Sequence, residues 1–363
     1  MQATSAAPLP SASDTQGLLD PVITSPALTE KHRGVNFGFY ARNGYYSTPQ
    51  ARLEVDRMAE LGVTWVCVIS TVFRETAVST TEFRDFEGTP DDAELRRIID
   101  YIHEKGMCVQ LRPMLEGLDG SDRSCVRFPE DRERIPGRSH NYWERWFKSL
   151  RSRTLHYARI AEETQCELYG LDSELEFTIS QNDHWKTIVD AARSVYSGPI
   201  DSCHTMWTDY LKELENPDHW WYDLDTLSLS AYFPAASHPG ATVDEMVQGL
   251  QPFLLQQRAV AEKFGKPYFF GECGATASRG GAMKPYAYDG NCVYAPDEQA
   301  NFLEAICQTF WNESWFRGLY WWKWDEQNNR PNFSQDPRGD CGFTLKNKPA
   351  AEVMKRWFTS RDF

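Results

Sequence analysis

The sequence lacks the features that mark membrane-spanning, secreted or nucleic-acid-binding proteins. No stretch approaches the roughly 20 consecutive apolar residues that a membrane-spanning helix needs. No basic start is followed by an apolar segment, so we expect no signal peptide in this chain. Basic residues are too few to balance the acid ones, and the net charge is −14. Such a chain is a poor partner for nucleic acid or an anionic membrane, which leaves neutral polymers as candidates.

Closely spaced cysteine and histidine sets of the kind that bind zinc are also missing. The nine cysteines are an odd number, and Cys67, Cys108 and Cys203 lie in apolar segments, where a free cysteine behaves as a small buried side chain. This usage favours a reducing compartment, so we expect a cytoplasmic rather than a secreted protein. No metal and no cofactor is implied.

Aromatic residues, in contrast, are abundant, with 13 Trp, 16 Tyr and 20 Phe. Most of them are expected to pack in the core. A minority at the surface would suit a carbohydrate ligand, because pyranose rings stack on aromatic faces.

Strand-like and helix-like segments alternate from residue 34 onward, which is typical of a parallel sheet covered by helices. The expected strands are 34–38, 65–69, 108–112, a run ending at Glu174, 200–204, 226–232, a run ending at Glu272, and 318–324. The expected helices are 48–61, 91–105, 141–163, 182–196, 243–264, 297–311 and 350–358. Long loops are expected at 118–139 and 274–292. We therefore predict an α/β fold, a single (β/α)8 TIM barrel over 32–363, preceded by a flexible arm over 1–31.

Two glutamates stand at the ends of apolar strands, Glu174 within 168–175 and Glu272 within 267–274. A carboxylate there has no packing role, and in a (β/α)8 barrel this rim carries the active site. Strands four and seven lie across the barrel from each other, so the two side chains can face each other as glycoside hydrolysis requires. We predict both as catalytic. The alternative for each alone is a carboxylate that caps a helix or pairs with arginine.

Further candidates for substrate contacts also lie near strand ends: Tyr232, Trp322, Trp324, Arg112, Asn36, Glu176, His204 and Trp207. Tyr232 is expected to hydrogen-bond Glu272 and favour its ionised form, or else to be a core tyrosine. Arg112 is expected to hold a carboxylate charge or a sugar hydroxyl, or to form a rim salt bridge. Of Trp322 and Trp324, one is expected to face inward as the floor of the subsite at the cleaved bond.

Glu176 is an outer-rim contact or helix-start residue, and it is also the alternative to Glu174 as the proton donor. His204 and Trp207 are expected to line the groove, although a lone histidine is more often structural. Asn36 is a weaker candidate of the same kind.

Taken in order, these segments resemble clan A glycoside hydrolases and are most similar to glycoside hydrolase family 113, the β-mannanases. The segments that carry the resemblance are 34–37, 111–113, 173–176, 229–234, 271–274, 318–324 and 348–350. The resemblance implies that Glu174 is the acid/base, that Glu272 is the nucleophile with retention of configuration, and that Tyr232 is the partner of the nucleophile. It implies a β-1,4-mannan or manno-oligosaccharide substrate.

The sequence departs from that pattern at positions that contact the sugar. Ser173 stands where clan A enzymes usually have Asn, Arg112 where the family often has Lys, and the segment from His204 to Trp207 where it has an Asn-Trp pair. The loop 275–294 differs as well. These departures bear on the substrate rather than on the reaction.

Three alternatives stay open. The same mechanism could act on another β-linked gluco-, xylo-, galacto- or modified glycan, with exo action if the long loops block the groove. A non-catalytic carbohydrate-binding barrel would bind without turnover. A metal-dependent hydrolase would need histidines clustered at strand ends. The sequence does not give the oligomeric state.

Overall fold

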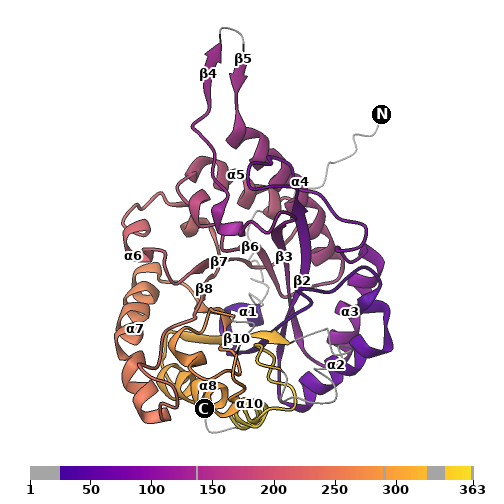
Figure 1. Ribbon diagram of the computed structural model, residues 1–363. Helices are drawn as coiled ribbons and strands as arrows, with labels where there is room; N and C mark the ends of the chain where they lie inside the picture. The colour runs from indigo at the N-terminus through magenta and orange to yellow at the C-terminus, as the bar shows by residue number, and fades with distance from the viewer. Residues whose placement is uncertain (1–24, 136–137, 289–291, 325–339, 361–363) are drawn as a thin grey trace, which may run out of the picture.

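The structure is a computed structural model that describes residues 25–135, 138–288, 292–324 and 340–360 (Figure 1). Eight parallel strands close into a barrel in the order β1-β10-β9-β8-β7-β6-β3-β2. Their bounds are β1 His32–Phe37, β2 Trp65–Arg74, β3 Cys108–Gly117, β6 Leu168–Ser173, β7 Ile200–Thr205, β8 Leu227–Ser230, β9 Tyr268–Cys273 and β10 Phe316–Trp324. This confirms the predicted single (β/α)8 barrel.

Helices cover the outside of the barrel. They are α2 Pro49–Glu60, α3 Asp92–Glu104, α4 Tyr142–Glu163, α5 Asn182–Arg193, α6 Tyr210–Glu213, α7 Val243–Phe264, α8 Pro296–Phe310 and α10 Pro349–Thr359. Local sequence sets their ends: Asp91 and Glu94 form a capping box on α3, and Thr242 and Glu245 form another on α7. Within the described ranges, no helix is both long and apolar enough to cross a membrane.

The inside of the barrel is layered. Apolar side chains from the first residues of the strands, such as Trp65, Leu168 and Phe269, fill the lower end. Above them lies a fully buried polar layer that includes Arg112 and Asp201. Because the lower layers are filled, the upper rim is left as the place where a ligand can enter.

A short helix, α1 (Pro26–Thr29), closes the lower end of the barrel. Ala27 is fully buried, and its carbonyl lies 3.1 Å from Nε2 of His32, whose ring stacks on Trp65 with centroids 4.1 Å apart. Residues 25–31 therefore belong to the barrel rather than to the predicted flexible arm, because they bury apolar surface against it. The rest of that arm, 1–24, lies outside the described residues.

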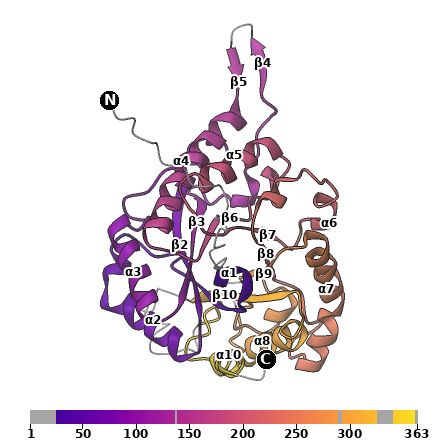
Figure 2. The same ribbon diagram turned by 180° about the vertical axis from the view of Figure 1, so that it is seen from behind.

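The described parts of the two predicted long loops contain structure that was not predicted. The segment 118–139 carries a 3-10 turn, η2 (Arg123–Cys125), and an antiparallel hairpin of β4 (Arg132–Ile135) and β5 (Arg138–His140), which projects away from the barrel (Figure 2).

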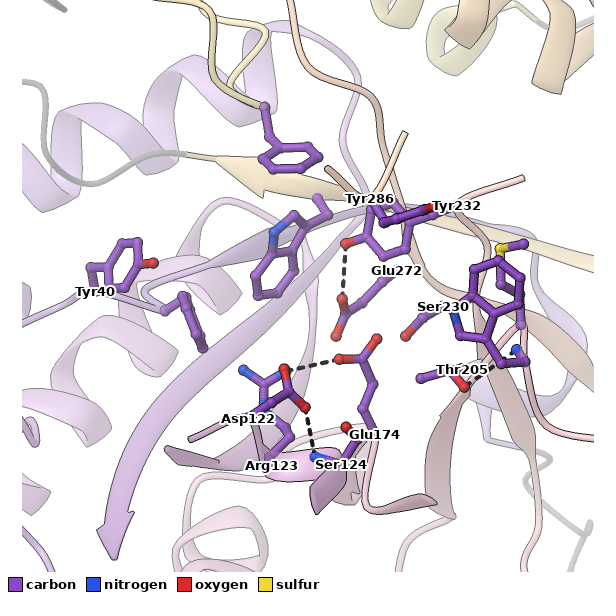
Figure 3. A pocket seen from close by; sticks show the side chains of 15 residues that line it. Tyr40, Asp122, Arg123, Ser124, Glu174, Thr205, Ser230, Tyr232, Glu272 and Tyr286 are labelled. Atoms are coloured by element: carbon purple, nitrogen blue, oxygen red, sulfur yellow. Dashed lines mark hydrogen bonds and ion pairs between the residues drawn. The ribbon is translucent and has the colours of Figure 1, made fainter. Parts of the chain in front are cut away.

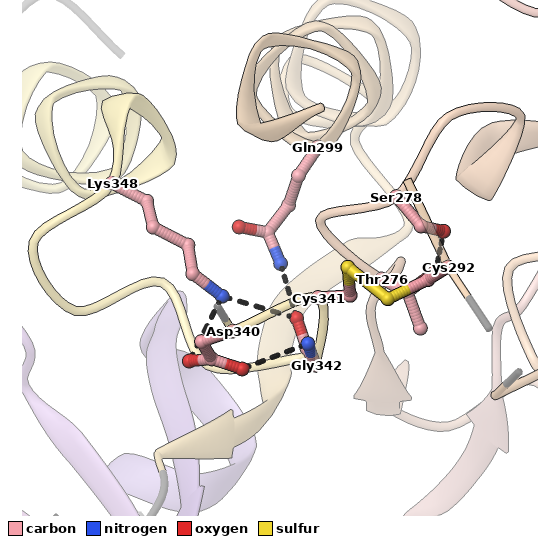
Figure 4. The surroundings of a disulfide bond; sticks show 8 residues. All are labelled: Thr276, Ser278, Cys292, Gln299, Asp340, Cys341, Gly342 and Lys348. Carbon is pink, nitrogen blue, oxygen red and sulfur yellow. Dashed lines mark hydrogen bonds and ion pairs between the residues drawn. A yellow bond between two sulfur atoms is a disulfide. The ribbon is translucent and has the colours of Figure 1, made fainter. Parts of the chain in front are cut away.

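The other loop is tied to the segment after β10 by a disulfide between Cys292 and Cys341 (Figure 4). We did not predict this pairing, because 49 residues separate the two cysteines in the sequence. The remaining cysteines of the described ranges are free thiols. The cytoplasmic location stays a prediction.

Candidate active site

A pocket of about 480 Å³ opens at the upper rim of the barrel, above the carboxyl ends of the strands (Figure 3). The structure brings five of the predicted site residues into its lining: Glu174, Glu272, Tyr232, Trp322 and Trp207. Ten other residues complete it: Phe39, Tyr40, Asp122, Arg123, Ser124, Thr205, Met206, Ser230, Tyr286 and Phe343.

Glu272 lies within β9, where it pairs in register with Ser230 of β8. Each carboxylate oxygen accepts one hydrogen bond: Oε2 from the phenol of Tyr232 at 2.9 Å, and Oε1 from the hydroxyl of Ser173 at 2.8 Å. Two donors on separate oxygens fix the direction of the carboxylate and favour its ionised form. The predicted contact of Tyr232 with Glu272 is therefore present in the structure.

Burial has the largest effect on the pKa of Glu272. Loss of hydration, together with the charge of Glu174, raises the pKa of Glu272 to about 7. The guanidinium groups of Arg112 and Arg123 oppose that rise. Burial therefore works against the ionised form of Glu272, and the two arginines and the hydroxyl of Ser173 work in its favour.

Arg112 lies beneath Glu272 rather than in the pocket. Its Nη1 is 3.8 Å from Oε1 of Glu272, and its Nη2 is 3.6 Å from Oδ2 of Asp201. The side chain is fully buried, so it supplies positive charge to Glu272 but does not reach a sugar in the pocket. Of the predicted roles for Arg112, only the contact with a carboxylate is compatible with this position.

Glu174 is the first residue after β6 and has a left-handed backbone, with φ of 62°. Its amide donates to the carbonyl of Cys203 at 2.9 Å. A non-glycine residue in this region costs on the order of 1 kcal/mol, and such residues gather at functional sites. The turn points the side chain into the pocket, where its carboxylate faces that of Glu272 (Figure 3).

Arg123, in η2, contacts Glu174 and was not predicted. Its Nη1 donates to Oε2 of Glu174 at 2.9 Å, and Nη2 pairs with Glu116 at the end of β3. An arginine in a charged loop is usually solvated, so the sequence carries no signal for this contact. Only the folding of the loop over the barrel mouth brings Arg123 to the site.

The two tryptophans of β10 lie on different sides of the strand. Trp322 lines the pocket and packs on Phe39 with ring centroids 5.1 Å apart. Trp324 is buried on the outer side, where its indole N–H donates to Glu54 of α2 at 2.7 Å. Residues two apart normally share a face, but the register between β1 and β10 shifts by one residue here, as in a β-bulge. Trp324 is therefore not placed to bind substrate.

Asn36 and His204 are also placed away from the pocket. Asn36 is buried and donates to the carbonyl of Gly271 at 3.1 Å, which ties β1 to the residue before Glu272. Nε2 of His204 accepts the indole N–H of Trp221 at 3.0 Å, and burial lowers the pKa of His204 to about 3. Both are structural residues rather than substrate contacts, because neither exposes a polar atom to the pocket.

Glu176 lines a neighbouring hollow, not the pocket with Glu272. Its carboxylate accepts hydrogen bonds from the amide of Thr205 and the hydroxyl of Thr208, and burial raises its pKa to about 7. Since it does not share a pocket with Glu272, Glu174 is the better placed of the two for proton donation.

Three hollows follow one another across the rim. The central pocket shares Phe39 and Tyr40 with a hollow of about 310 Å³ beside β2 and β3. It shares Ser124, Thr205 and Trp207 with a hollow of about 520 Å³ on the other side. Trp207 is 67% exposed. Together they form a groove with an aromatic ring at each junction and both carboxylates at its centre, which suits a chain of sugar rings.

The described residues contain no group of three or more His, Cys, Asp or Glu side chains arranged to hold a metal ion. The ionisable groups that face each other in the pocket are the carboxylates of Glu272 and Glu174. One is buried and fixed by two hydrogen bonds, and the other is paired with a cation at the edge of the pocket.

Comparison with known proteins bears on the same segments. The family model of Glycoside Hydrolase Family 113 matches residues 35–360 of this chain. A solved GH113 β-1,4-mannanase complex has 26% identity and a TM-score of 0.78, over 92% of this chain and 100% of that one. A GH113 β-mannanase from Alicyclobacillus acidocaldarius, in complex with ManMIm, has 27% identity and a TM-score of 0.78, over 91% and 97%.

A family 5 mannosidase from Rhizomucor miehei has 12% identity and a TM-score of 0.60, over 91% of this chain and 93% of that one, which shows a shared fold alone. No curated protein sequence matches this chain.

Proposed function

This chain belongs to Glycoside Hydrolase Family 113, and from that premise we propose that it is a retaining β-mannanase acting on β-1,4-mannan and manno-oligosaccharides. The observation that carries the proposal is the buried Glu272, held by Tyr232 and Ser173 and facing Glu174 in one pocket. The β-mannanases of the same family, with 26% and 27% identity, support the choice of sugar.

In the first half of the reaction, Glu272 attacks the anomeric carbon and Glu174 gives its proton to the leaving oxygen. The hydrogen bonds from Tyr232 and Ser173 keep the nucleophile ionised and aimed. The product of this half is a glycosyl-enzyme ester on Glu272.

In the second half, Glu174 takes a proton from water, and that water attacks the anomeric carbon and releases Glu272. Two inversions give net retention. The residues of the pocket supply every proton transfer, so the mechanism requires no cofactor.

The groove supports cleavage within a chain rather than at its end. Hollows flank the catalytic pocket on both sides and share residues with it. Trp207 and Tyr40 are exposed rings at the two junctions, where sugar rings of a bound chain would stack.

The test uses β-1,4-linked manno-, gluco- and xylo-oligosaccharides of increasing length, with products separated by chromatography and their anomeric configuration read by NMR. We expect cleavage of the manno series from within, with retention, and no turnover by Glu272→Ala. Cleavage of another series alone would refute the choice of sugar. Binding without turnover would refute the enzymatic role.

The role of Glu174 needs a matched pair of variants, Glu174→Ala and Glu176→Ala. A dinitrophenyl mannoside has a leaving group that departs without protonation, so we expect Glu174→Ala to spare the first half-reaction there and to lose it on oligosaccharides. Glu176→Ala should not discriminate between the two substrates. The reverse result would make Glu176 the proton donor.

A further inference from the structure

Arg123 is shared between two carboxylates of different roles. Nη1 donates to Glu174 at 2.9 Å, and Nη2 pairs with Glu116, which lines the hollow next to the catalytic pocket. Nε donates to the carbonyl of Leu115 at 3.0 Å, and the guanidinium lies 5.3 Å from the ring centroid of Phe39. Each donor nitrogen is engaged and the residue is 8% exposed, so the position of the guanidinium is fixed.

This contact bears directly on proton donation. A cation beside a carboxyl group favours the ionised form, whereas the first half-reaction needs Glu174 protonated. Of the ion pairs among the described residues, only that with Arg123 reaches Glu174. The other ionisable groups that face Glu174 or lie beside Arg123 are Glu272 from β9, Tyr232 after β8, Glu176 from the turn η3 (Glu176–Thr178) and Asp122 before η2.

We propose that Arg123 and Glu116 act as a pair that sets how readily Glu174 gives up its proton. Arg123 is a positioning residue, and Glu116 is the carboxylate that keeps Arg123 neutralised while Glu174 is protonated. This inference rests on the proposed function, because it takes Glu174 as the acid/base.

The pair accounts for both states of Glu174. When Glu174 is protonated, Arg123 still has a carboxylate partner in Glu116, so no buried cation is left uncompensated. When the proton passes to the leaving oxygen, the new carboxylate of Glu174 already lies 2.9 Å from Arg123. The proton returned from water in the second half restores the first state.

Two variants should act in opposite directions. Proton donation by Glu174 requires its protonated form, so activity should be lost toward high pH. Arg123→Gln removes the cation, so the alkaline limb of kcat/KM should move to higher pH. Glu116→Gln leaves the whole charge of Arg123 to Glu174, so the alkaline limb should move to lower pH. A neighbouring cation favours the ionised form of a carboxyl group, so the two displacements of the alkaline limb should be opposite in sign.

The acidic limb of the pH profile of kcat/KM distinguishes an effect on Glu174 from a general disturbance of the site. Arg123 is among the charges that hold down the pKa of Glu272, whereas Glu116 lines the neighbouring hollow rather than the pocket of Glu272. Arg123→Gln should therefore move the acidic limb upward as well, whereas Glu116→Gln should leave it in place. Arg123→Lys keeps the charge and serves as the matched control, with both limbs close to those of the wild type.

The experiment combines the pH dependence of kcat/KM with carbon-13 NMR titration of the glutamate carboxyl groups in the substrate-free protein. Glu174→Gln identifies the resonance of Glu174, and thermal unfolding verifies that each variant is folded. Opposite displacements of the Glu174 titration in Arg123→Gln and Glu116→Gln are the expected result.

Displacements in the same direction, or none in either variant, would overturn the inference. The titration needs no turnover. A wild type that cleaves no mannan would therefore refute the proposed function while the NMR result still decides the role of Arg123.

Discussion

Ser173→Ala is the substitution that most directly tests the support of Glu272, the proposed nucleophile. Ser173 ends β6, and its hydroxyl donates to Oε1 of Glu272 at 2.8 Å in a buried setting. Without it, the nearest cation to this oxygen is Arg112, with Nη1 at 3.8 Å, which is too long for a hydrogen bond. The contact of Tyr232 with Oε2 stays in place.

The expected loss follows from the charge on Glu272. A hydrogen bond to an ionised group contributes about 1.5 to 3 kcal/mol, which corresponds to a roughly 10- to 150-fold fall in kcat/KM. The hydroxyl of Ser173 is one of the contacts that hold the pKa of Glu272 down against burial, which raises it to about 7. Removing it raises that pKa further. Because the nucleophile acts as a carboxylate, the acidic limb moves to higher pH and the loss is greatest below neutral pH.

The assay is kcat/KM on a manno-oligosaccharide across both limbs of the pH profile. Ser70→Ala is the matched control, since it removes a buried hydroxyl of β2 that bonds Tyr157 at 3.0 Å, outside the pocket. A Ser173→Ala enzyme with wild-type rate and an unmoved acidic limb would refute the reasoning. So would an equal loss in Ser70→Ala, which would point to a general effect on the barrel.

Three further outcomes follow from the same structure. Tyr232→Phe should lower kcat/KM by a similar factor and also move the acidic limb upward, because it removes the donor to Oε2 of Glu272; an unchanged limb would contradict this. Trp207→Ala should raise KM for long manno-oligosaccharides but not for short ones, with an unchanged melting temperature because the ring is 67% exposed; a uniform rise would contradict a subsite at the junction of the central pocket and the neighbouring hollow. Cys292→Ser should lower the free energy of unfolding by about 2 to 4 kcal/mol in denaturant titrations, and a reductant should bring the wild type to the same value but leave the variant unaffected.

Much of the fold could be predicted because each local signal agrees with the barrel. The helix 243–264 has the predicted bounds, since Thr242 caps its start and Gly265 ends it in a left-handed conformation. The strands β2 and β3 run further than predicted because they stay paired in register up to Arg74 and Gly117. Ser70 in β2, and Arg112 with Pro113 in β3, interrupt the apolar pattern before the strands end.

The site residues that lie at the ends of strands could be predicted from the sequence. Glu272, Tyr232 and Trp322 follow from the rule that strand ends meet at one rim, and the structure brings them together. Which of Trp322 and Trp324 faces inward could not be predicted, because that choice depends on a register shift between two strands, which no local pattern reports. Arg123 and Tyr286 come from loops whose course depends on tertiary contacts, so the sequence gives no sign of either.

The two carboxylates are held by different kinds of backbone. Glu272 lies within a strand of the sheet and is paired with Ser230, so its position is tied to the register of the barrel strands. Glu174 stands one residue beyond its strand on a left-handed turn, and the backbone angles of this residue set the direction in which its side chain leaves the chain. Changes in the turn that follows Glu174 can therefore retune proton transfer without displacing the attacking oxygen, so the two halves of the reaction are open to separate engineering.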